Sequence, residues 1–524
     1  MSEKPIALEL RGVTKTFGDI VANKKVDLTL HHGEILAILG ENGSGKTTLM
    51  NMIAGIYYPD EGRIYVDGKE ASIRSPKDAF TYGVGMIHQH FKLVDVFSAA
   101  DNIVLGINDG TKYNKKEIAK KVSAIADKYG FHLDPNKKIH EMAVSEKQTV
   151  EIIKVLYRGA DILILDEPTA VLTPQETEKL FNVLRNMRDD GKSIIIITHK
   201  MHEVMSISDS VAVLRKGQHI ATVETAKTTE SELADMMIGK KVSLNIERTE
   251  PKDPKRRLTV SNINSTNVDG ISVLKDISFN VNSGEILGIA GIAGSGQREL
   301  LESIAGLYHL DSGSITYVDP KTDKEENLRD KNPIQIRELG VRLSFVPEDR
   351  LGMGLVGNMD IIDNMMLRSY RKGKSAFLDR TKPKELAENI IKSLEVVTPD
   401  AHTPVRRLSG GNVQKVLVGR EIAAAPSLLM AAYPVRGLDI NSSYMIYNLL
   451  TKQKESGVAV IFVGEDLDVL IDLCDRIIVM NSGKITGIVD ARTIKKEEIG
   501  LLMTKSTSVS EDEAAKSEGG AVNG

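Results

Sequence analysis

The chain has 524 residues, which is too long for a single hydrophobic core, and its 41% hydrophobic and 27% charged residues are ordinary for a soluble globular protein. Its formal net charge of -4 argues against a nucleic acid as the main ligand, because DNA- and RNA-binding domains normally carry a basic face. The single cysteine, Cys474, excludes a disulfide framework, a cysteine-based zinc site and an iron–sulfur cluster.

The chain shows no pattern for secretion or for crossing a membrane. Its first residues lack a basic segment followed by an apolar one. The apolar runs, such as 193–198 and 458–463, are far shorter than the roughly 20 residues that a membrane helix needs. We therefore expect a cytoplasmic protein that reaches a membrane only through partners.

A glycine-rich loop lies between an apolar strand predicted at 35–39 and a helix predicted at 48–54. It fits the pattern G-x-x-x-x-G-K-[ST], in which backbone N–H groups surround phosphates and the helix N-terminus favours the anion. We expect Lys46 to neutralise the β- and γ-phosphates and Thr47 to bind magnesium. The residues expected to contact the nucleotide here are Gly40, Glu41, Asn42, Gly43, Ser44, Gly45, Lys46, Thr47 and Thr48.

A second apolar run, at 161–165, ends in two carboxylates, Asp166 and Glu167. Two acids at the carboxyl end of a strand can divide the chemistry between them. Asp166 is expected to hold magnesium through water, and Glu167 to orient and polarise the attacking water.

Three further side chains complete the predicted site. Gln89 follows a short apolar strand, His199 follows another and could reach a γ-phosphate, and Phe17 could stack on adenine or belong to the core. His88 and His90 flank Gln89, but we do not interpret them as a metal site because cysteine or acidic partners are missing nearby.

The chain repeats itself. The segment Gly33–Gly40 returns almost unchanged as Gly284–Gly291, and the glycine pattern after it returns as well. The period has the length of a domain, so the chain is a duplicated domain and not a solenoid. In each half, short β-branched runs alternate with longer amphipathic stretches, which predicts a mostly parallel sheet flanked by helices.

Four segments follow from the repeat. The first domain is expected at 1–246 and the second at 258–505, with a charged, proline-containing and solvated linker at 247–257. Residues 506–524 are rich in Ser, Glu, Ala and Gly, so we expect a disordered tail.

Taken in order, these motifs resemble the ATP-binding-cassette (ABC) family, over nearly the whole chain and twice. The resemblance implies an α/β fold of two tandem ABC-type P-loop domains, each with a mainly parallel core sheet, an antiparallel β subdomain and a helical subdomain. Phe17 matches the A-loop, 40–47 the Walker A motif, Gln89 the Q-loop, 166–167 the Walker B motif and His199 the switch histidine. Hydrolysis is thereby assigned to Glu167, His199, Lys46 and Gln89, and Mg²⁺ binding to Thr47, Gln89 and Asp166.

The second half keeps the loop glycines but departs from the family at its chemical positions. Gln297 stands where the lysine belongs and Arg298 where the magnesium hydroxyl belongs. Ala432 and Tyr433 replace the two Walker B acids, and Glu348 and Glu465 occupy the Q-loop and switch positions. We expect no hydrolysis at this second site, whose loop residues are Gly291, Gly294, Ser295, Gly296, Gln297 and Arg298.

The signature motif, in contrast to the Walker motifs, is intact in the second half and altered in the first. The second half matches the family's LSGGQ closely, whereas the first half reads Met142-Ala-Val-Ser-Glu146. In this family's head-to-tail dimer each signature covers the opposite Walker A site, so the losses pair up. One composite site is expected to hydrolyse ATP, and the other at most to hold nucleotide. The signature residues expected to contact ATP are Ser409, Gly410, Gly411 and Asn412.

Single chains of this kind resemble the ATPases of bacterial importers of simple sugars and nucleosides. The segments 346–350, 408–412 and 436–439 look like that group's second-half motifs, and 86–91 together with 431–434 look most like its purine-nucleoside branch. The resemblance implies two different permeases, an extracytoplasmic substrate-binding lipoprotein, no nucleic acid, and a place at the cytoplasmic face of the cell membrane. A sugar importer is the alternative, and a soluble tandem ABC protein acting on ribosomes a remote one, because the chain lacks a long basic linker and two intact sites.

Overall fold

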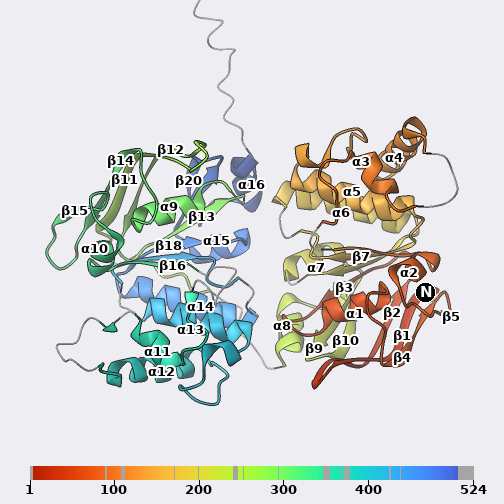
Figure 1. Cartoon of the computed structure of the whole chain (residues 1–524), viewed down its shortest axis with the longest axis horizontal. Coiled ribbons are helices and arrows are strands. Elements are labelled where there is room, and N and C mark those ends of the chain that lie inside the picture. The colour runs from red at the N-terminus through yellow and green to blue at the C-terminus, as the bar shows by residue number, and fades with distance from the viewer. Residues whose placement is uncertain are drawn as a thin grey trace, which may run out of the picture. The chain divides into compact units, whose positions relative to one another are not determined.

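The protein folds as two compact units, the first made mainly of Met1–Asn245 and the second mainly of Ile246–Arg436 and Met445–Gly524 (Figure 1). The structure is a computed structural model. It describes residues 4–88, 91–107, 113–169, 172–198, 200–239, 246–251, 253–292, 294–345, 354–367, 369–370, 378–423, 426–436, 438 and 440–504, with 344 and 345 described in their backbone only.

The first unit contains two sheets. Its strands are β1 (Ile6–Phe17), β2 (Ile20–His31), β3 (Ile35–Leu39), β4 (Glu61–Val66), β5 (Lys69–Glu70), β6 (Val84–Ile87), β7 (Ile162–Asp166), β8 (Ser193–Ile197), β9 (Ser210–Arg215) and β10 (Gln218–Glu224). Its helices are α1 (Lys46–Ile53), α2 (Pro76–Thr81), α3 (Ala99–Val104), α4 (Lys115–Tyr129), α5 (Val144–Tyr157), α6 (Pro174–Asp189), α7 (Met201–Ile207) and α8 (Glu230–Ile238).

One sheet is antiparallel, in the order β2-β1-β4-β5, and the other has the order β10-β9-β3-β8-β7-β6. In the second sheet only the β9–β10 pair is antiparallel among the described pairings. Because successive side chains of a strand point to opposite faces of the sheet, β7 contributes to two hydrophobic cores. Leu163 and Leu165 pack with helices α3 to α6, whereas Ile162 and Ile164 pack with α1 and the antiparallel sheet. Figure 1 shows these layers, with α3 to α6 on one side of the central sheet and α1 on the other.

The second unit repeats the plan. Its strands are β11 (Arg256–Thr266), β12 (Ser272–Asn282), β13 (Ile286–Gly291), β14 (Ser312–Val318), β15 (Glu325–Asn327), β16 (Val341–Phe345), β17 (Leu428–Ala432), β18 (Ala459–Val463), β19 (Arg476–Asn481) and β20 (Lys484–Asp490). The helices are α9 (Gln297–Ile304), α10 (Pro333–Glu338), α11 (Ile361–Met366), α12 (Thr381–Ser393), α13 (Gly410–Ile422), α14 (Ile440–Glu455), α15 (Leu467–Leu473) and α16 (Lys496–Thr504). The sheet orders are β12-β11-β14-β15 and β16-β17-β18-β13-β19-β20, so the topology matches that of the first unit.

The predicted α/β class with a mainly parallel core sheet and an antiparallel sheet is confirmed in both units. In the described ranges, no helix combines the length and the hydrophobicity that a membrane crossing requires.

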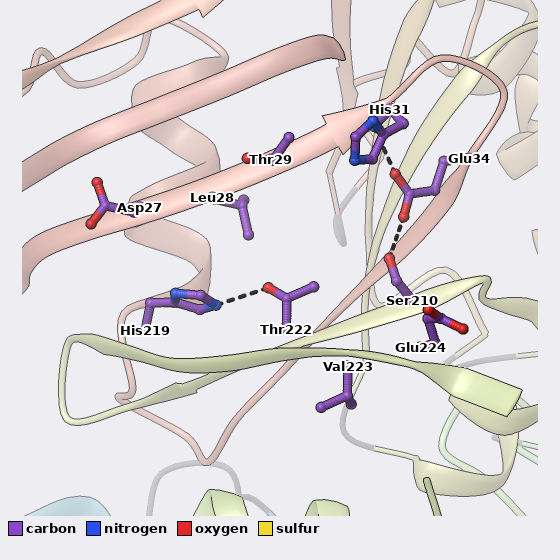
Figure 2. Close-up of a pocket in the computed structure, with 10 residues that line it drawn as sticks. All are labelled: Asp27, Leu28, Thr29, His31, Glu34, Ser210, His219, Thr222, Val223 and Glu224. Atoms are coloured by element: carbon purple, nitrogen blue, oxygen red, sulfur yellow. Dashed lines mark hydrogen bonds between the residues drawn. The ribbon is translucent and has the colours of Figure 1, made fainter. Parts of the chain in front are cut away.

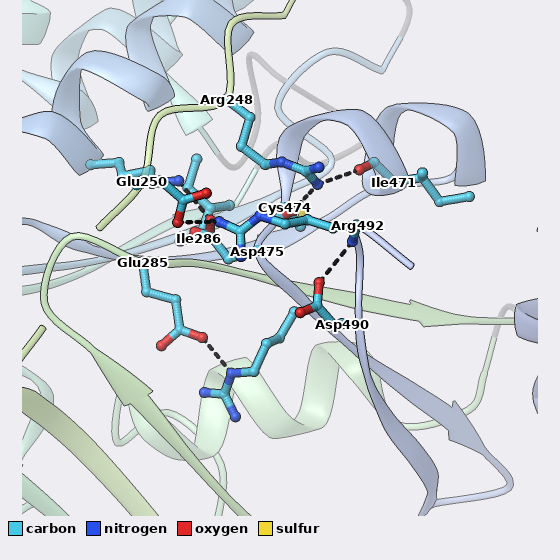
Figure 3. Close-up of polar contacts among 11 residues, drawn as sticks. Arg248, Glu250, Glu285, Ile286, Ile471, Cys474, Asp475, Asp490 and Arg492 are labelled. Atoms are coloured by element: carbon cyan, nitrogen blue, oxygen red, sulfur yellow. Dashed lines mark hydrogen bonds and ion pairs between the residues drawn. The ribbon is translucent and has the colours of Figure 1, made fainter. Parts of the chain in front are cut away.

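The start of the second unit differs from a solvated linker. Arg248 donates hydrogen bonds to the carbonyl oxygens of Ile471 (2.9 Å) and Cys474 (2.8 Å) at the end of α15, and Glu250 forms an ion pair with Arg492 (2.8 Å; Figure 3). The carbonyls at a helix end lack partners within the helix, so a cation there is favourable. Strand β11 already begins at Arg256. The domain limits at 246 and 258 and the tail at 506–524 stay predictions, and the tail lies outside the described residues.

Cys474 is buried next to this contact. Its side chain is fully buried, and an added Cβ at Gly288 would come within 2.8 Å of its sulfur. Burial raises the pKa of the Cys474 thiol, because a charged thiolate is disfavoured away from water.

Candidate active site

The phosphate loop of the first unit requires glycine at three positions, because of a close contact at one and positive φ values at the others. An added Cβ at Gly40 would lie 2.4 Å from the carbonyl oxygen of Leu214, and Gly43 and Gly45 have φ values of 80° and 95°. A side chain is strained at such positive φ values. Gly45 begins α1 without a side-chain cap, so the first N–H groups of the helix remain available for an anion.

Lys46 is folded back into this loop. Its side chain is 7% exposed, and Nζ donates hydrogen bonds to the carbonyl oxygens of Gly40 (2.7 Å) and Glu41 (2.9 Å). Burial lowers the pKa of Lys46, and the negative charges of Glu167 and Asp166 oppose that shift. The ammonium group therefore interacts electrostatically with both acids at the end of β7.

The two acids are held at the carboxyl end of the central sheet. Burial and the charge of Glu167 raise the pKa of Asp166 to about 6, and Lys46 acts in the opposite direction. Glu167 adopts a left-handed backbone conformation (φ 47°), and its N–H donates to the carbonyl oxygen of Ile197 in β8 (2.9 Å). Two neighbouring carboxylates that destabilise each other's charge form a donor set that a hard divalent cation would relieve.

An aromatic ring is available beside this unit's antiparallel sheet. Phe17 ends β1 and is 42% exposed, and it packs edge-to-face against Tyr57 with the ring centroids 5.2 Å apart. Its other contact is Lys15, whose Nζ lies 5.6 Å from the ring centroid. A ring that is this exposed can stack on a planar base.

The corresponding loop of the second unit keeps the same backbone conformation but carries different side chains. Gly294 and Gly296 have φ values of 83° and 97°. Gln297 is buried and donates from Nε2 to the carbonyl oxygen of Ile292 (3.2 Å), much as Lys46 does in the first unit. Arg298 forms an ion pair with Glu302 one turn along α9 (2.7 Å).

The second unit also keeps the turn after β17 without its acids. Tyr433 has a φ of 52°, and its N–H donates to the carbonyl oxygen of Val463 (2.9 Å), which reproduces the geometry of Glu167. Burial raises the pKa of the Tyr433 phenol. Glu465 pairs with Arg436 (3.4 Å).

The two signature segments differ at the start of their helices. Ser409 begins α13, where its Oγ accepts from the side-chain Nδ2 of Asn412 (2.9 Å), and both Ser409 and Gly410 are exposed. In the first unit Ala143 begins α5 and has no hydroxyl. Its N–H donates instead to a carboxylate oxygen of Glu146 (2.8 Å). The second segment thus presents a hydroxyl and glycine N–H groups, whereas the first has no hydroxyl at this place and a carboxylate that is paired with Lys137 (2.7 Å).

A family model described as "ABC transporter" matches residues 23–170 and 274–434. The chain belongs to the ABC transporter family. The nucleoside import ATP-binding protein NupA of Lactococcus lactis subsp. cremoris is 42% identical over 95% of this chain and 97% of its own. The guanosine import ATP-binding protein NupO of Bacillus subtilis is 41% identical over 98% and 99%. The ribose import ATP-binding protein RbsA 2 of Escherichia coli O157:H7 is 36% identical over 96% and 98%.

The protein is therefore an ABC ATPase with two tandem ATP-binding domains. In the first ABC domain the structure brings together the predicted loop residues 40–48 with Lys46, Asp166 and Glu167. Gln89, His199 and Glu348 were also predicted, but these three lie outside the described residues. The individual roles of the site residues stay predictions.

Sequence reasoning missed two residues that hold this ABC site together. Glu203 accepts hydrogen bonds from the hydroxyls of Thr169 (2.6 Å) and Thr198 (3.3 Å), which join the segments after β7 and β8. Gln148 in α5 donates to the carbonyl oxygen of Pro168 (2.7 Å), and Gln414 in α13 donates in the same way to Pro434 (2.8 Å). The sequence did contain a signal for the glutamines: Gln148 and Gln414 occupy matching positions in the two signature helices, although the neighbouring residues differ.

Proposed function

We propose that this chain is the ATP-hydrolysing subunit of a nucleoside importer, acting at the cytoplasmic face of the membrane. Its partners in this proposal are two different permeases and an extracytoplasmic substrate-binding lipoprotein. The observation that carries the proposal is the electrostatic coupling of Lys46, Asp166 and Glu167 in the first ABC domain, set against Gln297, Ala432 and Tyr433 in the second.

The proposed chemistry uses the first domain's residues in separate roles. Lys46 leaves the loop carbonyls and binds the β- and γ-phosphates, because these oxygens carry far more negative charge than a carbonyl. Glu167 polarises the attacking water. Thr47, Gln89 and Asp166 would hold a Mg²⁺ ion, Asp166 through water, and the ion would supply positive charge to the phosphate oxygens. Phe17 stacks on the adenine ring, and His199 contacts the γ-phosphate.

Only one composite site hydrolyses ATP in this proposal. The first domain's Walker residues work with the signature of the second, where Ser409 offers its hydroxyl. The opposite pairing lacks a hydroxyl at Ala143 and has no acid to activate water. The second loop therefore holds nucleotide at most.

The substrate assignment rests on the relatives. Two nucleoside-importer ATPases share 42% and 41% identity with this chain over almost its full length, and the ribose-importer ATPase shares 36%. A simple-sugar importer is the alternative substrate class.

The test is uptake by cells that carry Lys46→Ala on this chain. Uptake of labelled inosine and guanosine should fall to background, because the loop loses its charge at the phosphates, while uptake of ribose and galactose should not change. The matched control is Gln297→Ala at the same position of the second loop, which should leave nucleoside uptake near the wild-type rate. Loss of sugar uptake with intact nucleoside uptake would overturn the substrate assignment and leave the ATPase assignment standing.

A further inference from the structure

A cavity of about 480 Å³ lies in the first unit between strand β2 and the β9–β10 hairpin (Figure 2). Its lining residues do not include those of the phosphate loop or the acids of β7. The residues that line it are Asp27, Leu28, Thr29, His31, Glu34, Ser210, His219, Thr222, Val223 and Glu224.

The lining of this cavity is acidic. It includes three carboxylates, Asp27, Glu34 and Glu224, and no lysine or arginine, although Glu224 forms an ion pair with the neighbouring Lys227 (2.8 Å). Burial lowers the pKa of His219, whose Nε2 lies 2.9 Å from the Thr222 hydroxyl, so this ring is uncharged at neutral pH. The cavity therefore suits a cation.

The carboxylate of Glu34 is fixed at one end of the cavity. Glu34 is buried, with only 8% of its surface exposed. One oxygen accepts the backbone N–H of His31 (2.7 Å), and the other accepts the hydroxyl of Ser210 (Figure 2).

The second unit contains the same carboxylate with a different partner. Glu285 accepts the backbone N–H of Asn282 (2.8 Å), as Glu34 does from His31. Its other oxygen accepts from Nε of Arg476 (2.6 Å; the carboxylate is shown in Figure 3). The Arg476 guanidinium also donates to the backbone oxygen (2.8 Å) and side-chain oxygen (3.2 Å) of Asn280 in β12.

Neighbouring contacts show that Ser210 and Arg476 occupy equivalent positions. The residues directly before them, Asp209 and Asp475, accept backbone N–H groups from the residues that follow Glu34 and Glu285 (2.8 and 2.9 Å). The first repeat thus keeps the carboxylate that binds a guanidinium in the second repeat, and has a serine and a cavity where the guanidinium lies.

We propose that the cavity of the first unit binds a small molecule that carries a guanidinium group. Glu34 is its main partner, and Asp27 adds negative charge around it. A guanidinium is planar and matches the two oxygens of a carboxylate, which a point-like ammonium or metal ion does not reproduce. The volume of about 480 Å³ leaves room for a substituent on the guanidinium. Bound there, the ligand joins β2 to the β9–β10 hairpin, as Arg476 joins β12 to β19.

The test uses the full chain with methylguanidinium chloride and ligand-observed NMR, with tetramethylammonium chloride and urea as matched controls for charge and shape. We expect saturable binding of methylguanidinium to the wild type and none of either control compound. Ser210→Arg restores an internal guanidinium and should weaken methylguanidinium binding at least tenfold, while ATP hydrolysis continues at the wild-type rate and shows that the variant is folded.

A second variant covers the case in which Ser210→Arg does not fold. Arg476→Ser recreates the cavity in the second unit, so it should bind twice as many methylguanidinium ions and regain thermal stability when the ion is added. Absence of saturable binding to the wild type would overturn the proposal. Unchanged binding by Ser210→Arg, or displacement of methylguanidinium by Zn²⁺ but not by agmatine, would overturn it as well.

Discussion

At the scale of single residues, the two repeats differ in chemistry while sharing a backbone. Glu167 and Tyr433 both adopt a left-handed conformation, and both donate their N–H to the next strand of the sheet. The turn is thus required by the fold whether or not an acid occupies it. In the proposed mechanism, hydrolysis depends on the side chain at this turn.

Glu167→Gln tests this at the first repeat. The amide keeps the size of the side chain but cannot take a proton from water, so ATP hydrolysis should fall about 10²- to 10⁴-fold while ATP binding remains. Tyr433→Phe, at the matching turn, should leave turnover largely unchanged. Steady-state phosphate release and equilibrium nucleotide binding measure the two effects, and equal losses in both variants would contradict a single hydrolytic site.

At the scale of elements, the two signature helices differ in the residues with which they begin. The helix α13 begins with the Ser409 hydroxyl and two glycines, whereas α5 begins with Ala143 and the Glu146 carboxylate. A γ-phosphate could accept hydrogen bonds from the first arrangement, whereas the second offers no hydroxyl at this place.

Ser409→Arg should therefore abolish ATP hydrolysis, because a bulky side chain replaces the hydroxyl at the start of α13. The matched substitution Ala143→Arg, at the start of α5, should be much milder. Phosphate release by both purified variants is the measurement. Retained activity in Ser409→Arg, with loss in Ala143→Arg, would show that the other composite pairing is the active one.

Arg248 tests a different element, the end of α15. Arg248→Ala removes two charge-assisted hydrogen bonds to the carbonyl oxygens of Ile471 and Cys474, and we expect the loss to cost about 1.5–3 kcal/mol in total. Hydrogen–deuterium exchange in Leu467–Leu473 should accelerate about 10- to 100-fold. The control is Arg63→Ala, which removes an exposed ion pair with Glu70 and should not change exchange in α15. Unchanged exchange in Arg248→Ala would mean that this contact does not hold the helix end.

At the scale of the whole molecule, the proposed active site takes its parts from two repeats of one chain. An intramolecular site does not depend on encounters between molecules. The ATPase rate per chain should therefore stay constant when the purified protein is diluted from micromolar to nanomolar concentration. A rate that falls with dilution and recovers on concentration would show that the site forms between two chains.

Sequence reasoning identified what is encoded in short contiguous segments. The strand at 35–39, the phosphate loop and the acids after β7 are each written in fewer than ten consecutive residues, and the structure has β3 at Ile35–Leu39. The repeat then showed that a second copy of the fold follows. Both parts of the prediction rest on local patterns and on identity between distant segments.

Contacts between distant residues were beyond this reasoning. Glu203 joins Thr169 and Thr198 only because the sheet places β7 beside β8. The cavity beside Glu34 depends on the packing of β2 against β10, and on one serine that matters only when it is compared with Arg476. The contacts of Arg248 were hidden by a charged composition that is typical of solvated linkers.

The burial of Cys474 has a practical consequence for measuring motion. Its thiol is fully enclosed beside Gly288, and burial raises its pKa, so maleimide reagents should leave the native chain unmodified. The wild-type sequence therefore already provides a background without a reactive cysteine for site-specific labelling. A pair of fluorophores on introduced surface cysteines, one in each repeat, would report the distance between the repeats during ATP turnover without any prior substitution.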